Sequence, residues 1–286
     1  MDKQQILNSN QSYARDITEK SRSNFAASFI FLNPDKRRAM DAVYAFSRLV
    51  DDAVDESASP EEAKAKLIQW ERELNEAYHG NPGHPVMKEI AWSQLRFNIP
   101  KKYFDELITG VEQDLYRNRY QSFEELCHYT YGVASVVGLI CMKIFEVEGD
   151  DAEESAILLG RALQITNILR DIKSDAVNGR IYIPLQDLEQ FSLKEEDLLK
   201  GRISVRTDSL VMFEVARTEK IYQDAFRLMK KLPRKPLLAA WIMGKFYHQI
   251  LQKIKKNPRL PFQEKVSIPS WKKVGILFKE WARSLF

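Results

Sequence analysis

The stretch 164–175 constrains the fold of this chain more than any other segment. If it is helical, its polar side chains share one face, because offsets of three, four and seven residues bring side chains together. That polar face carries Gln164, Asn167, Asp171 and Asp175, and the apolar face carries Ile165, Ile168, Leu169 and Ile172. Such a helix buries its apolar face in a core and presents its carboxylates outside that core.

A second acidic cluster lies far upstream, at Asp51, Asp52 and Asp55, with Tyr44 and Arg48 on the same expected helix. Carboxylates at this spacing suit Mg²⁺, which is commonly shared between one or two protein carboxylates and the phosphates of a substrate. Taken alone, the upstream cluster is also compatible with a helix end in a solvated loop, and the downstream one with an exposed helix face. Two such clusters in one helical chain favour several Mg²⁺ ions around a diphosphate.

The composition is that of an ordinary globular protein, with 44% hydrophobic and 29% charged residues among 286. The net charge of +3 is too small to indicate nucleic-acid binding. Cys127 and Cys141 form neither a disulfide framework nor a metal-binding spacing, so we expect free thiols in a reducing compartment. The N-terminus does not resemble a signal peptide, and no stretch approaches the ~18 continuous apolar residues of a membrane span. We therefore expect a cytoplasmic protein.

Proline positions indicate where helices begin and end. Asn33 and Pro34 are typical of a helix start, as a capping residue followed by a first-turn proline. No proline occurs between Pro100 and Pro184, which leaves room for three or four long helices. Strict alternation of apolar and polar residues is scarce, so we predict an all-α chain. The helices expected in the proline-free interval include 123–147 and 152–175.

Small residues interrupt the expected helix 123–147. Glycine in a helix interior costs roughly 1 kcal/mol relative to alanine, so Gly132 and Gly138 indicate a packing or binding requirement. Together with Ala134 and Ser135 they allow a neighbouring helix or a ligand chain to approach closely.

The C-terminal segment, 268–286, is predicted to be a basic amphipathic helix. Its apolar residues recur at alternating spacings of three and four, namely Trp271, Val274, Phe278, Trp281 and Leu285. Its basic residues lie largely off that stripe, namely Lys272, Lys273, Lys279 and Arg283. Two interpretations stay open: the helix docks on the core, or it lies on an anionic membrane surface.

Three longer motifs resemble those of the squalene/phytoene synthase family of head-to-head prenyl transferases. They are the segments 44–55, 131–138 and 164–171, the last extended through 180–184. The resemblance covers nearly the whole chain from Ser21 onward. Within the family, the chain is most similar to bacterial presqualene diphosphate synthases of the squalene and hopanoid route.

The resemblance implies an all-α, single-domain isoprenoid-synthase helical bundle around a central cavity, spanning residues 1–286. The positions that match catalytic or metal-binding residues are Asp51, Asp52, Asp55, Asn167, Asp171 and Asp175, with Tyr131 at the reaction centre. The positions that match substrate contacts are Ser21, Ser23, Phe25, Tyr44, Arg48, Gln164, Asn167, Arg170, Arg180 and Tyr182. One departure is Ser174, where relatives often carry an acidic residue, and we expect it to alter metal affinity or ion count without removing activity.

The implied reaction is the Mg²⁺-dependent condensation of two farnesyl diphosphates to presqualene diphosphate, with release of pyrophosphate. Geranylgeranyl diphosphate in the same chemistry would give phytoene, and further rearrangement would give dehydrosqualene or, with NADPH, squalene. The chain has no dinucleotide fingerprint, but relatives that use NADPH need not have one, so NADPH stays open as a cofactor and is not the favoured interpretation. The implied partners are prenyl diphosphates and a downstream reductase or desaturase. A non-catalytic membrane-associated scaffold is the alternative from another class, and a head-to-tail elongator or terpene cyclase is a third.

Overall fold

The computed structural model describes residues 3–21 and 27–285, with side chains from Asn10 onward. Within these ranges the chain forms helices and no strand, which confirms the predicted all-α class. The first helices are α1 (Lys3–Lys20), α3 (Pro34–Asp55), α4 (Pro60–Tyr78), α5 (Pro85–Phe97), α6 (Lys101–Glu112), α7 (Phe123–Thr130) and α8 (Val136–Phe145). The later ones are α9 (Asp150–Arg170), α10 (Ile172–Val177), α11 (Leu185–Gln190), α12 (Glu195–Leu199), α13 (Val205–Met229), α14 (Leu238–Lys256), α15 (Leu260–Gln263) and α16 (Ser270–Arg283).

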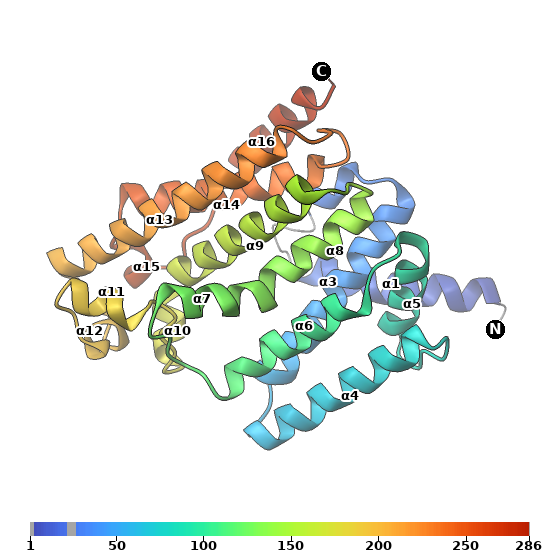
Figure 1. Ribbon diagram of the computed structural model, residues 1–286, viewed down its shortest axis with the longest axis horizontal. Coiled ribbons are helices and arrows are strands. Elements are labelled where there is room, and N and C mark those ends of the chain that lie inside the picture. The colour runs from blue at the N-terminus through green and yellow to red at the C-terminus, as the bar shows by residue number, and fades with distance from the viewer. Residues whose placement is uncertain (1–2, 22–26, 286) are drawn as a thin grey trace.

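Helix α9 is the central element of the bundle. It packs against α13 and α14 on one side and against α7 and α8 on the other (Figure 1). Its buried residues fall on nearly all sides of the helix, as expected for a helix enclosed by others. The carboxyl-terminal end of α9 carries the polar residues of the 164–175 stretch, so the core itself positions this motif.

Glycines allow the central helices to approach closely, as the sequence predicts. A Cβ atom on Gly160 of α9 would lie 2.7 Å from the carbonyl oxygen of Ala134, and one on Gly138 would lie 2.7 Å from that of Ala156. Gly132 meets Gly110 of α6 in the same way, at 2.8 Å from its Cα. Backbone therefore touches backbone where residues 132–138 meet α6 and α9, which leaves no room for a larger side chain.

Two expected helices are interrupted. Residues 123–147 do not form one regular helix, because a π-helical turn, Tyr131–Ser135, separates α7 from α8. Residues 152–175 do not form one helix either: α9 ends at Arg170, Asp171 leaves helical geometry at φ −105° and ψ 13°, and α10 follows. The predicted start at Asn33 is confirmed, since its side chain accepts a hydrogen bond from the Lys36 amide at the beginning of α3.

The stretch Phe123–Phe145 is the one helical segment among the described residues that is long and apolar enough to cross a membrane by length and composition. Most of its apolar window is buried inside the protein. It packs between α6 and α9, so its composition follows from its place in the core.

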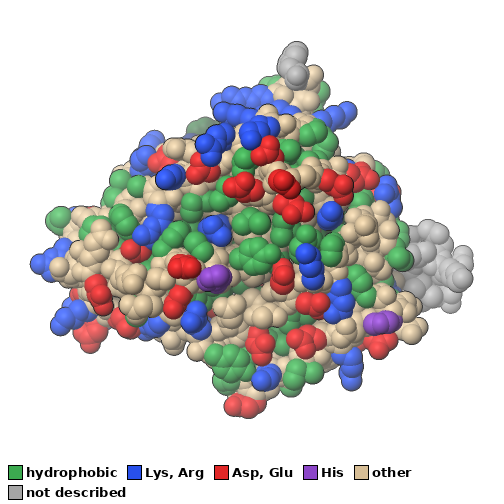
Figure 2. All heavy atoms as spheres, in the orientation of Figure 1, with side chains coloured by type: hydrophobic (Ala, Val, Ile, Leu, Met, Phe, Trp, Pro, Cys, Tyr) green, Lys and Arg blue, Asp and Glu red, His purple; other side chains and the backbone are tan. Residues whose placement is uncertain are grey.

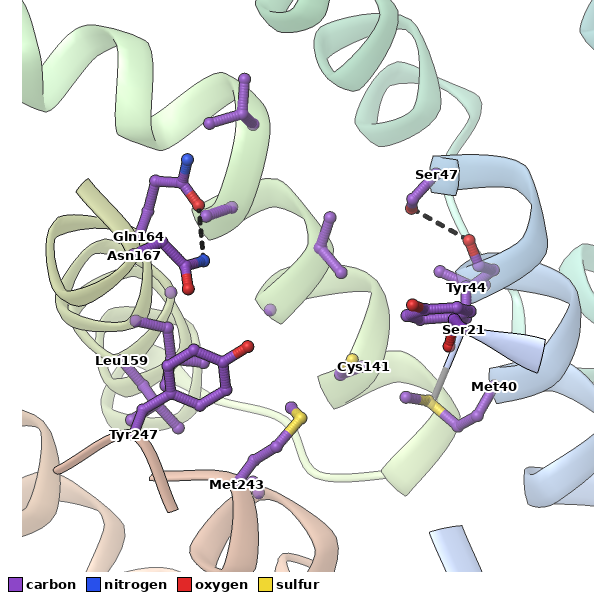
Figure 3. Close-up of a pocket in the computed structure, with 18 of the residues that line it drawn as sticks. Ser21, Met40, Tyr44, Ser47, Cys141, Leu159, Gln164, Asn167, Met243 and Tyr247 are labelled. Carbon is purple, nitrogen blue, oxygen red and sulfur yellow. Dashed lines mark hydrogen bonds between the residues drawn. The ribbon is translucent and has the colours of Figure 1, made fainter. Parts of the chain in front are cut away.

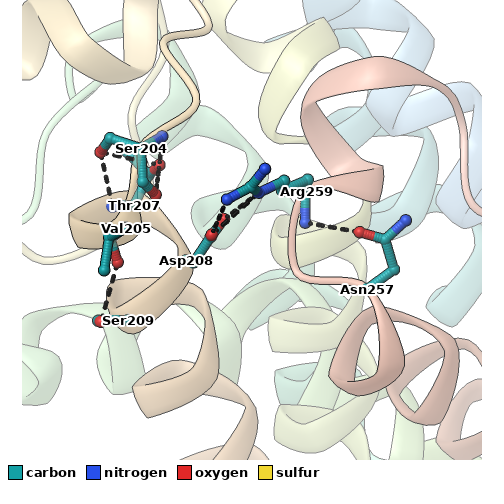
Figure 4. A network of polar contacts seen from close by, with 7 residues as sticks. All are labelled: Ser204, Val205, Thr207, Asp208, Ser209, Asn257 and Arg259. Carbon is teal, nitrogen blue, oxygen red and sulfur yellow. Dashed lines mark hydrogen bonds and ion pairs between the residues drawn. The ribbon is translucent and has the colours of Figure 1, made fainter.

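The loops at the end of the bundle are fixed by polar contacts (Figure 4). The Ser204 hydroxyl accepts from the Thr207 amide at the start of α13, and the Thr207 hydroxyl accepts from the Ser204 amide at 2.8 Å. Arg259, before α15, donates to the Asp208 carboxylate at 2.8 and 2.9 Å. This exposed ion pair links the turn before α15 to the first turn of α13.

A first prediction concerns the close packing at Gly160. The substitution Gly160→Ala is expected to lower the free energy of unfolding by about 1–3 kcal/mol, because the new methyl group meets backbone atoms that cannot move alone. The matched control is Gly275→Ala in α16, where an added Cβ meets nothing within 4 Å. Denaturant unfolding followed by circular dichroism measures both, and equal stability of the two variants would contradict the packing account.

Candidate active site

Two adjoining cavities lie at the centre of the bundle. The larger has a volume of about 560 Å³ and the smaller about 300 Å³, sizes within the range of ligand sites. The residues that line both are Asp51, Gln164, Asn167 and Arg170, so the cavities meet at the facing parts of α3 and α9. Figure 3 shows Gln164 and Asn167 on one side of the larger cavity and Tyr44 and Ser47 on the other.

The larger cavity is mainly apolar. Its walls come from α3, α8, α9 and α14 and from the segment 265–268. The apolar side chains include Phe29, Met40, Val137, Cys141, Met142, Phe145, Leu159, Leu163, Met243 and Ile250. Gly138 and Gly160 also line this cavity. The glycines that permit close helix packing therefore also leave its wall without side chains at these two positions. This lining suits an apolar ligand.

The smaller cavity is acidic. It is lined by carboxylates from α3, α10 and two chain turns, namely Asp51, Asp55, Asp114, Asp171 and Asp175, together with Arg170, Arg180, Tyr129 and Tyr182. Asp51 and Asp55 lie one helical turn apart on α3, and the end of α9 brings Asp171 opposite them. Carboxylates from two distant segments therefore converge on one space, as the two sequence clusters predict.

Burial next to other carboxylates makes two of these aspartates weak acids. Loss of solvent, with the nearby Asp55 carboxylate, raises the pKa of Asp51 to about 7. Burial, with the neighbouring Asp171 carboxylate, raises the pKa of Asp175 to about 7. Burial also raises the pKa of Asp114. Ionised carboxylates this close together repel one another, and such an arrangement is typical of a site that binds a cation.

Three arginines contact aspartates of the two clusters. Arg180 Nη1 donates to Asp55 at 3.1 Å, and Arg170 pairs with its neighbour Asp171, with an Nε–Oδ1 distance of 2.9 Å. Arg48 pairs with Asp52 at 2.6 Å. The first two guanidinium groups line the acidic cavity and the third lines the apolar one. A guanidinium group pairs with phosphate oxygens as readily as with a carboxylate.

The donor set fits Mg²⁺ shared with a phosphate ligand. Asn167 lies at the junction of the two cavities, and its buried Oδ1 atom has no hydrogen-bond partner among the described residues. An amide oxygen beside carboxylates is a suitable ligand for this ion. In residues 3–21 and 27–285, no three His, Cys, Asp or Glu side chains converge on one metal position. The oxygens are instead spread around the cavity, as suits an ion that also binds a diphosphate.

Stacked tyrosines form the far wall of the acidic cavity. The Tyr129 ring stacks on Tyr182 with centroids 5.3 Å apart, and Tyr182 stacks on Tyr120 at 5.9 Å. The hydroxyls of Tyr129 and Tyr182 both donate to the Asp114 carboxylate, at 2.9 and 3.0 Å. The backbone holds this wall in place, because Leu185 donates its amide to the Tyr120 carbonyl at 2.9 Å.

Most of the residues predicted from sequence line one of the two cavities. They are Ser21, Tyr44, Arg48, Asp51, Asp55, Gln164, Asn167, Arg170, Asp171, Asp175, Arg180 and Tyr182. Ser23 and Phe25 fall outside the described residues. The cavity lining within the described residues does not include Asp52, whose carboxylate points to Arg48 on its own helix.

Tyr131 also lies outside the lining of both cavities. Its hydroxyl donates to Glu106 of α6 at 3.3 Å. It is the first residue of the π-helical turn, and such a turn rotates the following side chains away from the positions that a regular helix gives. Tyr129, two residues earlier, occupies the acidic cavity instead.

The sequence leaves Asp114 open between a further acidic site residue and a surface partner of Arg117, three residues on, and it does not single out Tyr129 for the site. In the structure Arg117 approaches Glu125 at 3.7 Å, and Asp114 receives the hydroxyls of Tyr129 and Tyr182. The sequence signal for Asp114 is its position directly after the apolar face of an expected helix. Ser174 is exposed, and its hydroxyl donates to the Asp171 carbonyl at 2.9 Å.

Comparisons with known proteins agree with this geometry. The family model for squalene/phytoene synthase matches residues 18–272. Among curated proteins, a 15-cis-phytoene synthase from Synechocystis sp. is 34% identical over 282 residues, covering 94% of this chain and 84% of that protein. A phytoene synthase from Arthrospira platensis is 34% identical over 276 residues, covering 92% and 89% of the two chains.

Solved structures show the same similarity. A squalene synthase, HpnC, from Alicyclobacillus acidocaldarius has a TM-score of 0.82 at 28% identity, over 87% of this chain and 94% of that one. A dehydrosqualene synthase in complex with a ligand has a TM-score of 0.88 at 26% identity, over 98% of both chains. The two cavities thus lie in the all-α isoprenoid-synthase fold, and the chain belongs to the squalene/phytoene synthase family of prenyltransferases.

Proposed function

We propose that the protein catalyses the Mg²⁺-dependent head-to-head condensation of two farnesyl diphosphates to presqualene diphosphate, with release of pyrophosphate. The observation that carries this proposal is the junction of the two cavities. A space lined by carboxylates and arginines opens directly into one lined by apolar side chains. A prenyl diphosphate has the same two parts, a charged head and an apolar tail.

The polar residues at the junction bind the diphosphate head. Arg48, Arg170 and Arg180 offer guanidinium donors to the phosphate oxygens, and Gln164 and Asn167 face the same space. Mg²⁺ held by Asp51, Asp55, Asn167, Asp171 and Asp175 would neutralise charge on the leaving diphosphate. Residues placed in this way stabilise the charge that develops as the C1–O bond of the donor substrate breaks.

The apolar cavity protects the reacting carbons. When the C1–O bond breaks, the diphosphate leaves with the electron pair, and an allylic cation remains. The 2,3-double bond of the second substrate then forms a bond to the donor's C1, and loss of a proton from that carbon closes a cyclopropane ring. The walls of the cavity are largely hydrocarbon, so they exclude water that would capture the cation.

We assign the proton to the released pyrophosphate. Burial raises the pKa of Tyr129 well above its ordinary value, and its hydroxyl already donates to Asp114. Tyr129 therefore stays neutral and holds the acidic wall in place. Tyr131, which the resemblance places at the reaction centre, lies outside the described lining of both cavities.

A second candidate is phytoene synthesis from two geranylgeranyl diphosphates. It is favoured by the names of the curated relatives, which are phytoene synthases. The solved structures of similar fold are instead a squalene synthase and a dehydrosqualene synthase. The chemistry proposed above is the same for either chain length.

We propose that the reaction ends at presqualene diphosphate and needs no NADPH, and that a separate reductase or desaturase acts downstream. We place the enzyme in the cytoplasm, at the inner face of the cell membrane. The scaffold alternative gives no reason for the unpartnered Asn167 Oδ1 atom and the crowded carboxylates of Asp51 and Asp175 to face one space.

The test is product analysis by mass spectrometry. The pure protein is incubated with Mg²⁺ and either farnesyl or geranylgeranyl diphosphate, each with and without NADPH. We expect presqualene diphosphate from the shorter substrate, unchanged by NADPH. Phytoene from the longer substrate alone would establish the second candidate, squalene formed only with NADPH would extend the reaction, and the absence of any condensation product would favour the scaffold.

A further prediction separates the aspartates of α3. Asp51→Asn is expected to lower kcat/KM by about a hundredfold or more, because it removes an oxygen donor from the acidic cavity. Asp52→Asn should cost less than about tenfold, since that side chain lies beside Arg48 and outside the cavity. Steady-state kinetics at saturating Mg²⁺ distinguishes them, and equal losses in the two variants would count against this placement of the residues.

The raised pKa values predict how the stability of the ligand-free protein depends on pH. Asp51 and Asp175 have folded-state pKa values near 7, above their unfolded values, so their ionisation destabilises the fold as pH rises. Between pH of about 6 and about 8 the free energy of unfolding should fall by about 1–3 kcal/mol. Asp51→Asn should flatten this decline in metal-free thermal melts, and an unchanged slope would contradict the assignment.

A further inference from the structure

Helix α16 docks on the protein through its polar side. Of its residues, Glu280 is the buried one, with 2% of its surface exposed. Its carboxylate pairs with Arg234, in the turn between α13 and α14, and with Arg283 on its own helix, the latter at 3.1 Å. Ile276 and Leu277 add partial apolar contact on the same side. An ion pair therefore anchors α16 against α14.

The apolar stripe of α16 faces outward. All five of its residues are exposed, with Trp271 at 71%, Val274 at 62%, Phe278 at 66%, Trp281 at 39% and Leu285 at 61%. The helix docks, as one of the two sequence interpretations expects, but with the face opposite to the apolar one. A monomeric protein rarely exposes so continuous an apolar surface, and such a surface marks an interaction site.

Basic side chains flank the stripe. Lys272 lies with its ammonium group 5.3 Å from the centre of the Trp271 ring, and Lys279 is exposed next to Phe278. Arg283 is half exposed near the C-terminus. Figure 2 shows Lys and Arg side chains gathered along the upper edge of the molecule, where Figure 1 places the end of α16. Tryptophan and phenylalanine bordered by cations are the composition of a helix that lies in the interface of an anionic bilayer.

The segment that leads into α16 forms a wall of the apolar cavity. Residues 265–268 and Lys273, in the first turns of the helix, line the larger cavity. The outward stripe begins at Trp271, within the same turns. One short part of the chain therefore has the cavity on one side and the exposed aromatic surface on the other.

We propose that the stripe of α16 docks in the plane of an anionic phospholipid bilayer and places the cavity wall 265–268 beside the lipid. Charge favours this occupant, because the basic flank complements anionic headgroups and would repel a second copy of the same surface. In a part of the proposal that rests on the proposed function, the amphipathic product leaves the cavity for the adjacent bilayer, with its apolar chains entering the lipid.

The test is co-sedimentation with vesicles of equal parts phosphatidylglycerol and phosphatidylcholine, without substrate. The wild-type protein is expected to bind, and the double variant Trp271→Ser/Phe278→Ser to bind about tenfold more weakly or worse. Lys272→Gln/Lys279→Gln should remove the preference for these vesicles over pure phosphatidylcholine ones. Because the aromatic side chains are largely exposed, thermal melts of the variants should match the wild type.

The matched control is Ile68→Ser/Lys64→Gln on α4, at the opposite edge of the molecule (Figure 1). Ile68 is 55% exposed, so this variant removes the same kinds of surface and should bind as the wild type does. Absence of wild-type binding, or equal losses in the control, would overturn the docking surface. So would a wild-type dimer, detected by light scattering, that the aromatic variant converts to a monomer without vesicle binding.

Turnover tests the release of product separately. With farnesyl diphosphate, added vesicles should raise multiple-turnover rates of the wild type and leave those of the aromatic variant unchanged. Vesicle binding without any rate increase would overturn direct release into lipid and leave the docking surface in place. Vesicle binding without condensation would instead count against the proposed function.

Discussion

The crowding of carboxylates at the end of α9 is the constraint on which the rest of the structure depends. Asp51, Asp55, Asp114, Asp171 and Asp175 share one cavity, and burial raises the pKa of three of them. Their charges repel one another, so the fold supplies Arg170 and Arg180 as internal partners. Two arginines do not balance five carboxylates, and a bound metal ion can supply the missing positive charge. The unpartnered Asn167 oxygen lies at the junction of the same space.

This constraint explains the packing of the core. The acidic cluster must be held together by helices that cannot spread apart, and the contacts at Gly160, Gly138 and Gly132 bring their backbones to within van der Waals distance. Gly138 and Gly160 also line the apolar cavity beside the acidic one. The acidic cavity and the apolar cavity are therefore formed by one set of helices. A substrate with a charged head and an apolar tail can place one part in each cavity.

The sequence was sufficient to predict the helical class, the convergence of the two acidic clusters and the start of α3, because these follow from spacing, caps and proline positions. It was not sufficient to predict the break at Asp171 or the π-helical turn at Tyr131, since a regular period of 3.6 residues contains no signal for either. Tyr129, at the end of α7, faces the acidic cavity, and Tyr131, two residues later, contacts Glu106 of α6 instead. The outward stripe of α16 was also unpredictable, because an amphipathic period does not say which face the core accepts.

Binding of a substrate analogue tests the central claim most directly. Farnesyl thiodiphosphate, whose C1–S bond resists ionisation, can be titrated calorimetrically into the protein with and without Mg²⁺. The account predicts tight binding with Mg²⁺, binding weaker by about a hundredfold or more without it, and loss of this difference in Asp171→Asn. Equal affinity with and without Mg²⁺, or an Asp171→Asn variant that behaves as the wild type, would contradict a metal–diphosphate site at the junction of the two cavities.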